Sequence, residues 1–253
     1  MTIDEPDLAQ LPVLLQGSRQ QGLHGDLLEQ LGVAITNGDL PTGAVVTIEW
    51  LESQYGVSRS VVREVVRVLE SLGLAASRRR VGVAIMPTEN WNLYDSQIIR
   101  WRLASNACIN QLRALMEVRV AVEPEAARLA AIRSRRVDAG RLIGLAGNLW
   151  VAGEGENLEE FLNLDIEFHQ LVLTSSGNDM FARLGPVVRE MLVGRNEAGL
   201  NSPPELRALQ LHVDVASAIQ RGESEQAYED MREVMRRTMD EITPLLDEAG
   251  LPG

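Results

Sequence analysis

The sequence predicts a mainly α-helical protein of two domains, with a small β-hairpin in the first domain. The chain has 253 residues, of which 45% are hydrophobic and only 4% aromatic. This composition suits a helical globular protein long enough to build two cores. Apolar residues recur at helical spacing along most of the chain. Residues 74–87 differ, because small and β-branched residues surround a glycine there and a proline closes the tract, which is typical of two short strands.

Four segments are expected along the chain. Residues 1–20 contain prolines and polar residues without a period, which predicts a flexible arm. Residues 21–87 would form the first domain and residues 88–94, within a turn-rich tract, a linker. Residues 95–247 are predicted to be an all-α antiparallel helical bundle. Its helices are expected at roughly 95–105, 108–132, 136–151, 157–175, 178–198, 203–221 and 223–247.

The first domain reads as helices followed by a hairpin. A helix is predicted at 23–37, and a second short helix follows with Thr47 as its N-cap. Gly56 supplies a tight turn, and Ser58 takes the N-cap position of the next helix, which lies in VSRSVVREVVRVLESLG. Two short helices joined by a glycine turn and followed by a two-stranded wing indicate a winged helix-turn-helix.

One face of that third helix carries arginines. At 100° per residue, Arg59, Arg63 and Arg67 fall within about 80° of one another, and the valines and Leu69 occupy the other side. Residues 57–82 hold six arginines against two acids, in a chain of net charge -12. An arginine stripe on a solvated helix is common by itself. The glycine turn, the serine and the basic wing together favour DNA, since an acidic protein partner would need no wing.

A family resemblance rests on these residues. GDLPTGAVV, LESQYGVSRSVVREVVRVLESLGL and GVAIMP, within residues 23–87, resemble the winged helix-turn-helix of GntR-type bacterial regulators. The resemblance implies a homodimer on a palindromic operator, with Arg59 and Arg63 as operator readers. It extends the expected DNA-binding set to Ser58, Arg59, Ser60, Arg63, Arg67, Arg80 and Gly82. The chain departs from the pattern at Glu49, where relatives often carry an arginine that faces the phosphates.

Charge and cysteine content narrow the class of protein. A net charge of -12 argues against a surface that coats nucleic acid or acidic membranes as a whole, although it allows a local basic patch. The single cysteine, Cys108, excludes an intramolecular disulfide and a multi-cysteine metal site. We expect a cytoplasmic protein that neither carries an export signal nor spans a membrane.

The helical half places ionisable residues on apolar faces. Asp165 and His169 lie one turn apart on the predicted inner face of their helix, and His212 lies on the inner face of another. A single inward histidine is usually a satisfied core residue. Two histidines and an aspartate need partners when buried, and Asp-x-x-x-His can clamp a divalent metal. Arg119 also points inward, either as a salt-bridged helix residue or as a ligand-binding one.

A second resemblance covers this half. EVRVAVEPEAARLAA, LDIEFHQLVLTSSGN and AIQRGESEQAYEDMREVM resemble the FCD ligand-binding domain of the FadR branch. The resemblance implies a divalent metal such as Zn, Ni or Mn on Asp165, His169 and His212, and a small carboxylate effector bound by Arg119. Arg195, in MLVGRNE, is a candidate for a second effector-binding cation. The usual fourth ligand, a histidine, falls on Val234, and Thr238 is the nearest polar neighbour. The tract ENWNLYDSQIIRWRL is similar to that of regulators responsive to galactonate and other sugar acids.

The sequence therefore predicts a regulator, acting as a repressor of a catabolic operon, rather than an enzyme. A metal-dependent enzyme using Asp165, His169 and His212 is the alternative. It would need an acid or base positioned beside the metal, and no known catalytic motif accompanies the cluster. A module that binds an acidic protein through its basic helix is a further alternative.

Overall fold

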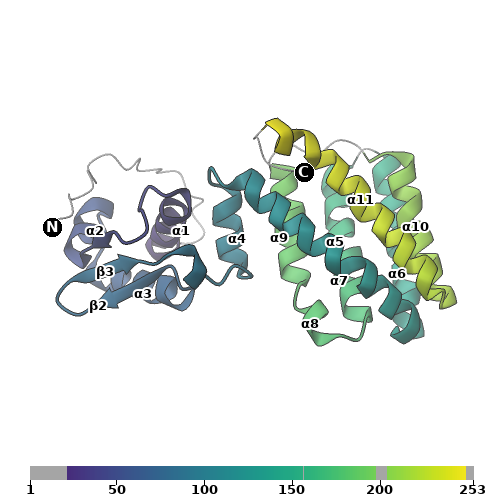
Figure 1. Cartoon of the computed structure of the whole chain (residues 1–253), viewed down its shortest axis with the longest axis horizontal. Coiled ribbons are helices and arrows are strands. Elements are labelled where there is room, and N and C mark those ends of the chain that lie inside the picture. Colours follow the sequence, from purple (N-terminus) through teal and green to yellow (C-terminus); the bar gives the residue numbers. More distant parts are fainter. Residues whose placement is uncertain (1–21, 156, 198–203, 249–253) are drawn as a thin grey trace. The chain divides into compact units, whose positions relative to one another are not determined.

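The computed structural model describes residues 22–155, 157–197 and 204–248, and these form two compact units, one up to Cys108 and one from Ile109. The predicted flexible arm, residues 1–20, lies outside the described residues. The mainly helical fold with a small sheet is confirmed. Figure 1 shows the elements of each unit in sequence colours.

Unit 1 contains four α-helices and a three-stranded sheet within its described residues. The elements are α1 (Gly22–Asn37), β1 (Val45–Val46), α2 (Ile48–Tyr55), α3 (Arg59–Ser71), β2 (Ala75–Arg78), β3 (Gly82–Ile85), the 3-10 turn η2 (Thr88–Asn90) and α4 (Ser96–Leu103). The sheet order is β1-β3-β2 and both pairings are antiparallel, with Val46 opposite Val83 and Ser77 opposite Val83 on its other side. The predicted wing is therefore present. The additional strand β1 was not predicted, because two residues are too few to show an alternating pattern.

Local signals account for the helix-turn-helix. Thr47 caps α2 by accepting a hydrogen bond from the backbone N–H of Trp50 at 3.1 Å. Gly56 ends α2 in the left-handed region, with φ 63°, a conformation that favours glycine. Val62, Val65, Val66 and Leu69 bury one face of α3 against the core that α1 helps to form. Helix α3 is thus fixed by its apolar face, and its arginine face remains exposed.

Helix α4 belongs to unit 1, although we expected the helical bundle to begin at residue 95. Trp101 is only 1% exposed and joins the core of this unit. Its indole Nε1 donates to Glu29 of α1 at 2.6 Å, and its ring lies over Gly32, where a β-carbon would come within 2.3 Å of it. The absence of a side chain at Gly32 is therefore what lets α4 pack on α1.

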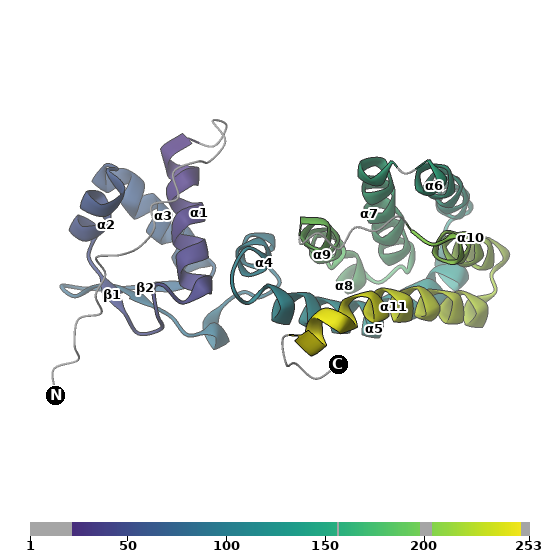
Figure 2. The same cartoon turned by 90° about the horizontal axis from the view of Figure 1, so that it is seen from above.

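Unit 2 is a helical bundle, as predicted. It consists of α5 (Cys108–Arg133), α6 (Arg136–Glu154), α7 (Leu158–Ser175), α8 (Asp179–Ala182), α9 (Gly185–Glu197), α10 (Leu206–Arg221) and α11 (Ser224–Glu248). Helices α9, α7, α6 and α10 lie side by side as neighbours in one layer. Figures 1 and 2 show α5 and α11 crossing one face of that layer.

One helix predicted for unit 2 is divided into two helices in the structure. We expected a single helix at 178–198, but the chain turns between α8 and α9. Pro186 lies at the second residue of α9. It has no backbone N–H to donate to the preceding turn, and its ring crowds the carbonyl four residues earlier, so it starts a helix more readily than it continues one. Among the described helices, none combines the length and apolarity needed to cross a lipid bilayer.

Candidate functional site

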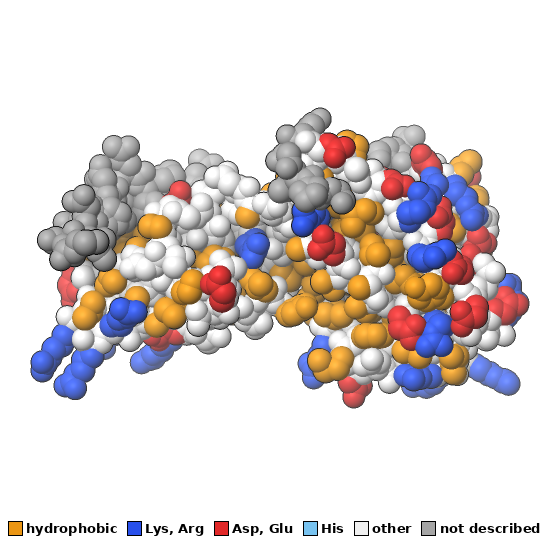
Figure 3. Space-filling model, in the orientation of Figure 1, with side chains coloured by type: hydrophobic (Ala, Val, Ile, Leu, Met, Phe, Trp, Pro, Cys, Tyr) orange, Lys and Arg blue, Asp and Glu red, His pale blue; other side chains and the backbone are white. Residues whose placement is uncertain are grey.

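Five of the seven residues predicted to contact DNA line one groove of unit 1. The groove has a volume of about 580 Å³ and is lined by α3, the start of α2 and the β2–β3 hairpin. Arg59, Arg63, Arg67 and Arg80 line it, together with Arg78. Figure 3 shows basic side chains projecting from the end of unit 1 where the hairpin turns. Helix and wing thus present their cations to the same space, as a duplex would require.

Ser58 and Ser60 lie at the exposed N-terminus of α3. Ser58 occupies the N-cap position, as expected, but its side chain forms no capping hydrogen bond. Its hydroxyl instead lies 2.9 Å from the hydroxyl of Ser60. The first N–H groups of α3 therefore face outward without a side-chain cap, an arrangement that suits a phosphate oxygen.

Gly82 has a role in the backbone of the wing. Its φ is 135°, and a β-carbon there would lie 2.5 Å from the carbonyl oxygen of Val46 on β1. Arg80, at the turn of the hairpin, also has a positive φ of 64°. The geometry of the wing therefore depends on Gly82 whether or not that residue contacts DNA.

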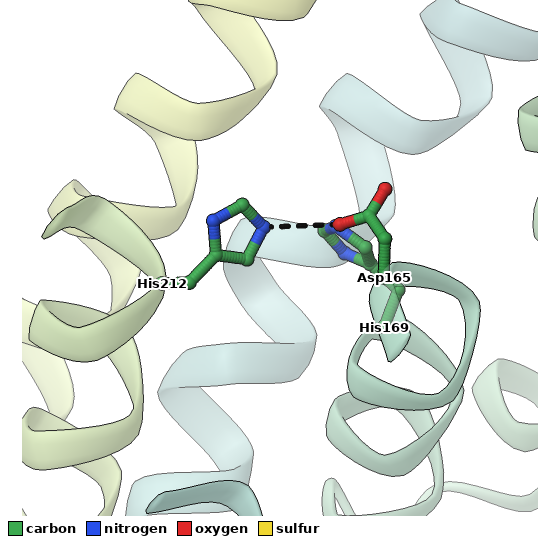
Figure 4. A group of neighbouring side chains, drawn as sticks. All are labelled: Asp165, His169 and His212. Atoms are coloured by element: carbon green, nitrogen blue, oxygen red, sulfur yellow. Dashed lines mark hydrogen bonds and ion pairs between the residues drawn. The ribbon is translucent and has the colours of Figure 1, made fainter. Parts of the chain in front are cut away.

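In unit 2, the three predicted metal ligands lie together. Asp165 and His169 project from α7 and His212 from α10, and all three side chains are buried (Figure 4). Asp165 Oδ1 is 3.1 Å from His212 Nε2 and 3.4 Å from His169 Nε2. One ligand atom from each residue lies within 4.8 Å of the other two. Ligand atoms around a tetrahedral zinc ion with bonds near 2.05 Å are about 3.4 Å apart, so the spacing of this donor set fits such an ion.

The tautomers of both histidines support the same conclusion. His212 Nδ1 lies 2.8 Å from the carbonyl oxygen of Ala208, which can only accept, so Nδ1 carries a proton. His169 Nδ1 forms an ion pair with Glu123 Oε2 and is protonated for the same reason. With the Nδ1 atoms engaged in this way, Nε2 of each ring faces the Asp165 carboxylate. These two Nε2 atoms and the carboxylate are the atoms that a metal ion would bind.

Glu123 of α5 is a central residue of this site that the sequence did not reveal. It is 1% exposed and contacts both His169 and Arg119. Arg119 donates from Nε to Glu123 Oε1 at 2.5 Å and from Nη2 to Oε2 at 3.4 Å, and its Nη1 lies 3.4 Å from Met191 Sδ. All three guanidinium nitrogens therefore have partners inside the protein.

The buried charges determine one another's ionisation. Burial alone would raise the pKa of Glu123, but Arg119 and His169 outweigh it and hold that pKa at about 2. Burial would likewise raise the pKa of Asp165, yet His169 and His212 keep it well below its usual range. Burial acts to lower the pKa of His169, and Glu123 and Asp165 overcome this and raise it to about 9. In the absence of a metal, His169 is therefore the cation that the two carboxylates stabilise.

A cavity of about 150 Å³ adjoins the cluster. It is lined by residues of α5, α7, α9, α10 and α11, including Asp165, His169, His212 and Arg119. Val234, at the predicted fourth ligand position, and Thr238 line it too, and the Thr238 hydroxyl donates to the Val234 carbonyl oxygen at 3.0 Å. Val234 offers no donor atom, so the cluster contributes three ligands.

Two further arginines lie at this cavity. Arg195 of α9, predicted from the sequence, is paired with Glu241 at 2.7 Å. Arg237 of α11 was not predicted and is paired with Glu205. Both carboxylates are far more exposed than Glu123, at 47% for Glu241 and 76% for Glu205. Their arginines can therefore change partner at much lower cost than Arg119 can.

A winged helix with a basic groove, followed by a helical domain with a buried polar cavity, defines the class of protein as a DNA-binding regulator of the winged helix-turn-helix type. Residues 24–85 match the gntR family of bacterial regulatory proteins, and residues 114–237 match the FCD domain. The chain belongs to the GntR family and carries an FCD domain as its second unit.

Relatives and solved structures agree with this assignment. The chain is 31% identical over 162 residues to the galactonate operon transcriptional repressor of Escherichia coli K12, an alignment that spans 64% of this chain and 70% of that protein. It is 29% identical over 164 residues to the uncharacterized HTH-type transcriptional regulator YieP of the same organism, spanning 64% and 71%.

Two solved structures share the fold. Lar, which controls expression of the Listeria monocytogenes agr system, superposes with a TM-score of 0.55 at 15% identity, covering 90% of this chain and all of that one. McbR/YncC of E. coli gives 0.50 at 18% identity, covering 88% and 98%. The family is one of transcription regulators, which disfavours the enzyme considered from the sequence.

Proposed function

We propose that this protein is a cytoplasmic, homodimeric repressor of a catabolic operon that binds a palindromic operator and is controlled by a small organic acid. The observation that supports regulation by an effector is the buried Asp165–His169–His212 cluster, which lies beside a cavity lined by three arginines. Buried ionisable groups that converge on a cavity are costly to the fold unless they bind something. The relative that represses the galactonate operon makes a sugar acid the first class of effector to test.

On DNA, helix α3 would enter the major groove and the wing would follow the backbone. Arg59 and Arg63, near the N-terminus of α3, would contact base edges, while Arg67 and Arg80 would contact phosphates. Ser58 and Ser60 would meet a phosphate at the start of the helix, and Gly82 would keep the wing in place. In a homodimer, the two α3 helices would address half-sites about one turn of DNA apart, which matches a palindrome.

In the helical domain, Asp165, His169 and His212 would hold a divalent ion such as Zn, Ni or Mn. Such an ion would supply a Lewis-acidic centre to which a carboxylate oxygen of the effector can bind. We propose Arg195 and Arg237 as the cations that meet the rest of the effector, since their own partners are exposed. Arg119 would act indirectly in this arrangement, because it holds Glu123, which in turn orients His169.

The DNA-binding part is tested with a duplex enriched by the wild-type protein from a random-sequence pool. Arg59→Ala and Arg63→Ala should abolish binding to that duplex in a gel-shift assay at moderate salt, while the melting temperature stays unchanged. Arg141→Ala, which removes an exposed arginine of α6 paired with Glu167, is the matched control and should bind as the wild type does. Wild-type binding by both α3 variants would refute the assignment.

The control function is tested by thermal shift with sugar acids and dicarboxylates, with and without a chelator. An effector should raise the melting temperature, because a ligand bound only to the folded state stabilises it by mass action. The same compound should change DNA binding, and His169→Ala should remove both effects while leaving DNA affinity intact. A response that survives both chelation and His169→Ala would exclude this cluster as the sensor.

A further inference from the structure

An ion pair in unit 1 connects helix α2 to Arg59, the first of the arginines proposed to contact base edges. Glu49, in the first turn of α2, lies with Oε1 2.8 Å from Nη1 of Arg59, the first residue of α3. Glu52, one turn along α2, is 3.8 Å from the same nitrogen. The side chains of Glu49 and Arg59 are 65% and 52% exposed. A pair so open to solvent adds little to folding, so its position in the groove needs another explanation.

The charges of the groove make Glu49 unusual. Two carboxylates line it beside the arginines, Glu49 and Glu70. Glu70 accepts a hydrogen bond from the backbone N–H of Ser77 at 2.6 Å, which ties α3 to the wing. Glu49 instead faces Arg59. A backbone hydrogen bond and Arg59 lower the pKa of Glu49, so its carboxyl group is ionised at neutral pH. A negative charge there opposes any approach of phosphates to this wall of the groove.

The geometry of the pair leaves part of Arg59 available. Arg59 meets Glu49 through Nη1. A guanidinium has a second edge, formed by Nε and Nη2, whose two parallel N–H groups match O6 and N7 of guanine. An arginine held at one nitrogen also loses less side-chain freedom when it binds a base.

We infer that Glu49 is a positioning residue that determines operator specificity: it holds Arg59 with one edge toward a guanine and keeps that arginine from neutralising a phosphate instead. The inference rests on the proposed DNA-binding function and adds a residue outside the recognition helix to it. Glu49 does not contribute affinity. It weakens binding to all DNA, and weakens binding to non-operator DNA more than to the operator.

The test compares two duplexes by fluorescence anisotropy over a series of salt concentrations. One is the duplex selected by the wild-type protein, and the other has the same base composition in scrambled order. In Glu49→Gln, affinity for the scrambled duplex should rise, and the preference for the selected duplex should fall at least about fivefold. The slope of log affinity against log salt on the scrambled duplex should steepen by about 0.9, the value for one additional phosphate contact.

Two controls separate positioning from charge alone. Glu89→Gln removes the same charge from η2, outside the groove, and should leave the preference unchanged. In an Arg59→Ala background, measured on the scrambled duplex at low salt, Glu49→Gln should raise affinity clearly less than it does with Arg59 present, because only the general repulsion between Glu49 and phosphates is then removed.

The outcomes are distinct. A preference within twofold of wild type in Glu49→Gln, or an equal effect of Glu49→Gln with and without Arg59, would overturn the inference while DNA binding stands. If the wild-type protein enriches no duplex from the random pool, the proposed DNA-binding function fails and this inference fails with it.

Discussion

His212 points its Nε2 at Asp165 Oδ1, 3.1 Å away, because its other ring nitrogen is held by the carbonyl oxygen of Ala208. The two residues are 47 positions apart in the chain and lie on α10 and α7. His169 approaches the same oxygen from one turn along α7. The fold thus directs two imidazoles at one carboxylate, and whichever cation lies there connects two helices of the layer.

The missing fourth ligand gives the first prediction. Val234→His should place an imidazole on the cavity wall beside the cluster and raise zinc affinity at least about tenfold, because a fourth donor completes the tetrahedral shell. Competition with a chromophoric chelator measures the affinity. Val234→Leu, which enlarges the side chain without adding a donor, is the control and should not gain affinity. Equal affinity in the two variants would show that position 234 does not face the ion.

A second prediction concerns the buried pair of Arg119 and Glu123. Glu123→Gln should lower the free energy of unfolding by about 3–5 kcal/mol, because it leaves the Arg119 guanidinium, 2% exposed, without a compensating charge. Denaturant titration of the metal-free protein measures this change.

The same helix provides the control for that variant. Glu117→Gln breaks an exposed i,i+4 pair with Arg113 on α5 and should cost less than about 1 kcal/mol. Similar losses in the two variants would mean that the buried pair is no more important to stability than a surface one.

The sequence predicted the parts of the site that depend on local periodicity. Asp165 and His169 share a helix face, so their spacing of four was sufficient to place them together. Glu123 was missed because its role depends on a contact with His169, 46 positions along the chain, that no local pattern encodes. Arg237 lies among charged residues of α11, most of which pair at the surface, so its position at the cavity was not visible either.

The fold shows the same division between local and long-range information. The break between α8 and α9 could have been recognised from the sequence, because Pro186 follows it and proline rarely continues a helix. The packing of Trp101 over Gly32 could not, since it joins residues of α4 and α1 that only the folded unit brings together. Helix α4 was therefore assigned to the wrong side of the linker by periodicity alone.

The third prediction is a pH dependence of the metal-free protein. His169 has a pKa of about 9 in the folded protein against 6.5 for an ordinary histidine, so its contribution to stability is complete below about pH 6.5 and is lost as pH rises through 9. The depressed pKa values of Glu123 and Asp165 change the free energy of unfolding only at acidic pH. The free energy of unfolding should therefore fall between pH 7 and 9.5. The shift of the His169 pKa from 6.5 to about 9 corresponds to a loss on the order of 3 kcal/mol.

His169→Gln isolates that contribution. The variant should be less stable than the wild type at pH 7, and its stability should change less between pH 7 and 9.5, because it lacks the titrating ring. Chemical denaturation with chelator present, at three pH values, measures both proteins. Parallel curves for the two proteins would show that His169 is not the group that titrates.

The last prediction concerns the backbone of the wing. Gly82→Ala should destabilise the protein by about 1–3 kcal/mol, because alanine at φ 135° is strained and its β-carbon would lie 2.5 Å from the Val46 carbonyl oxygen.

Gly38→Ala is the matched control, since Gly38 also has a positive φ, of 86°, but a β-carbon there meets nothing within 4 Å. That variant should lose only about 1 kcal/mol. Thermal unfolding compares the two, and anisotropy on the selected duplex should show weaker DNA binding for Gly82→Ala alone. If both variants lose the same stability and DNA affinity, the contact between β3 and β1 does not control the wing.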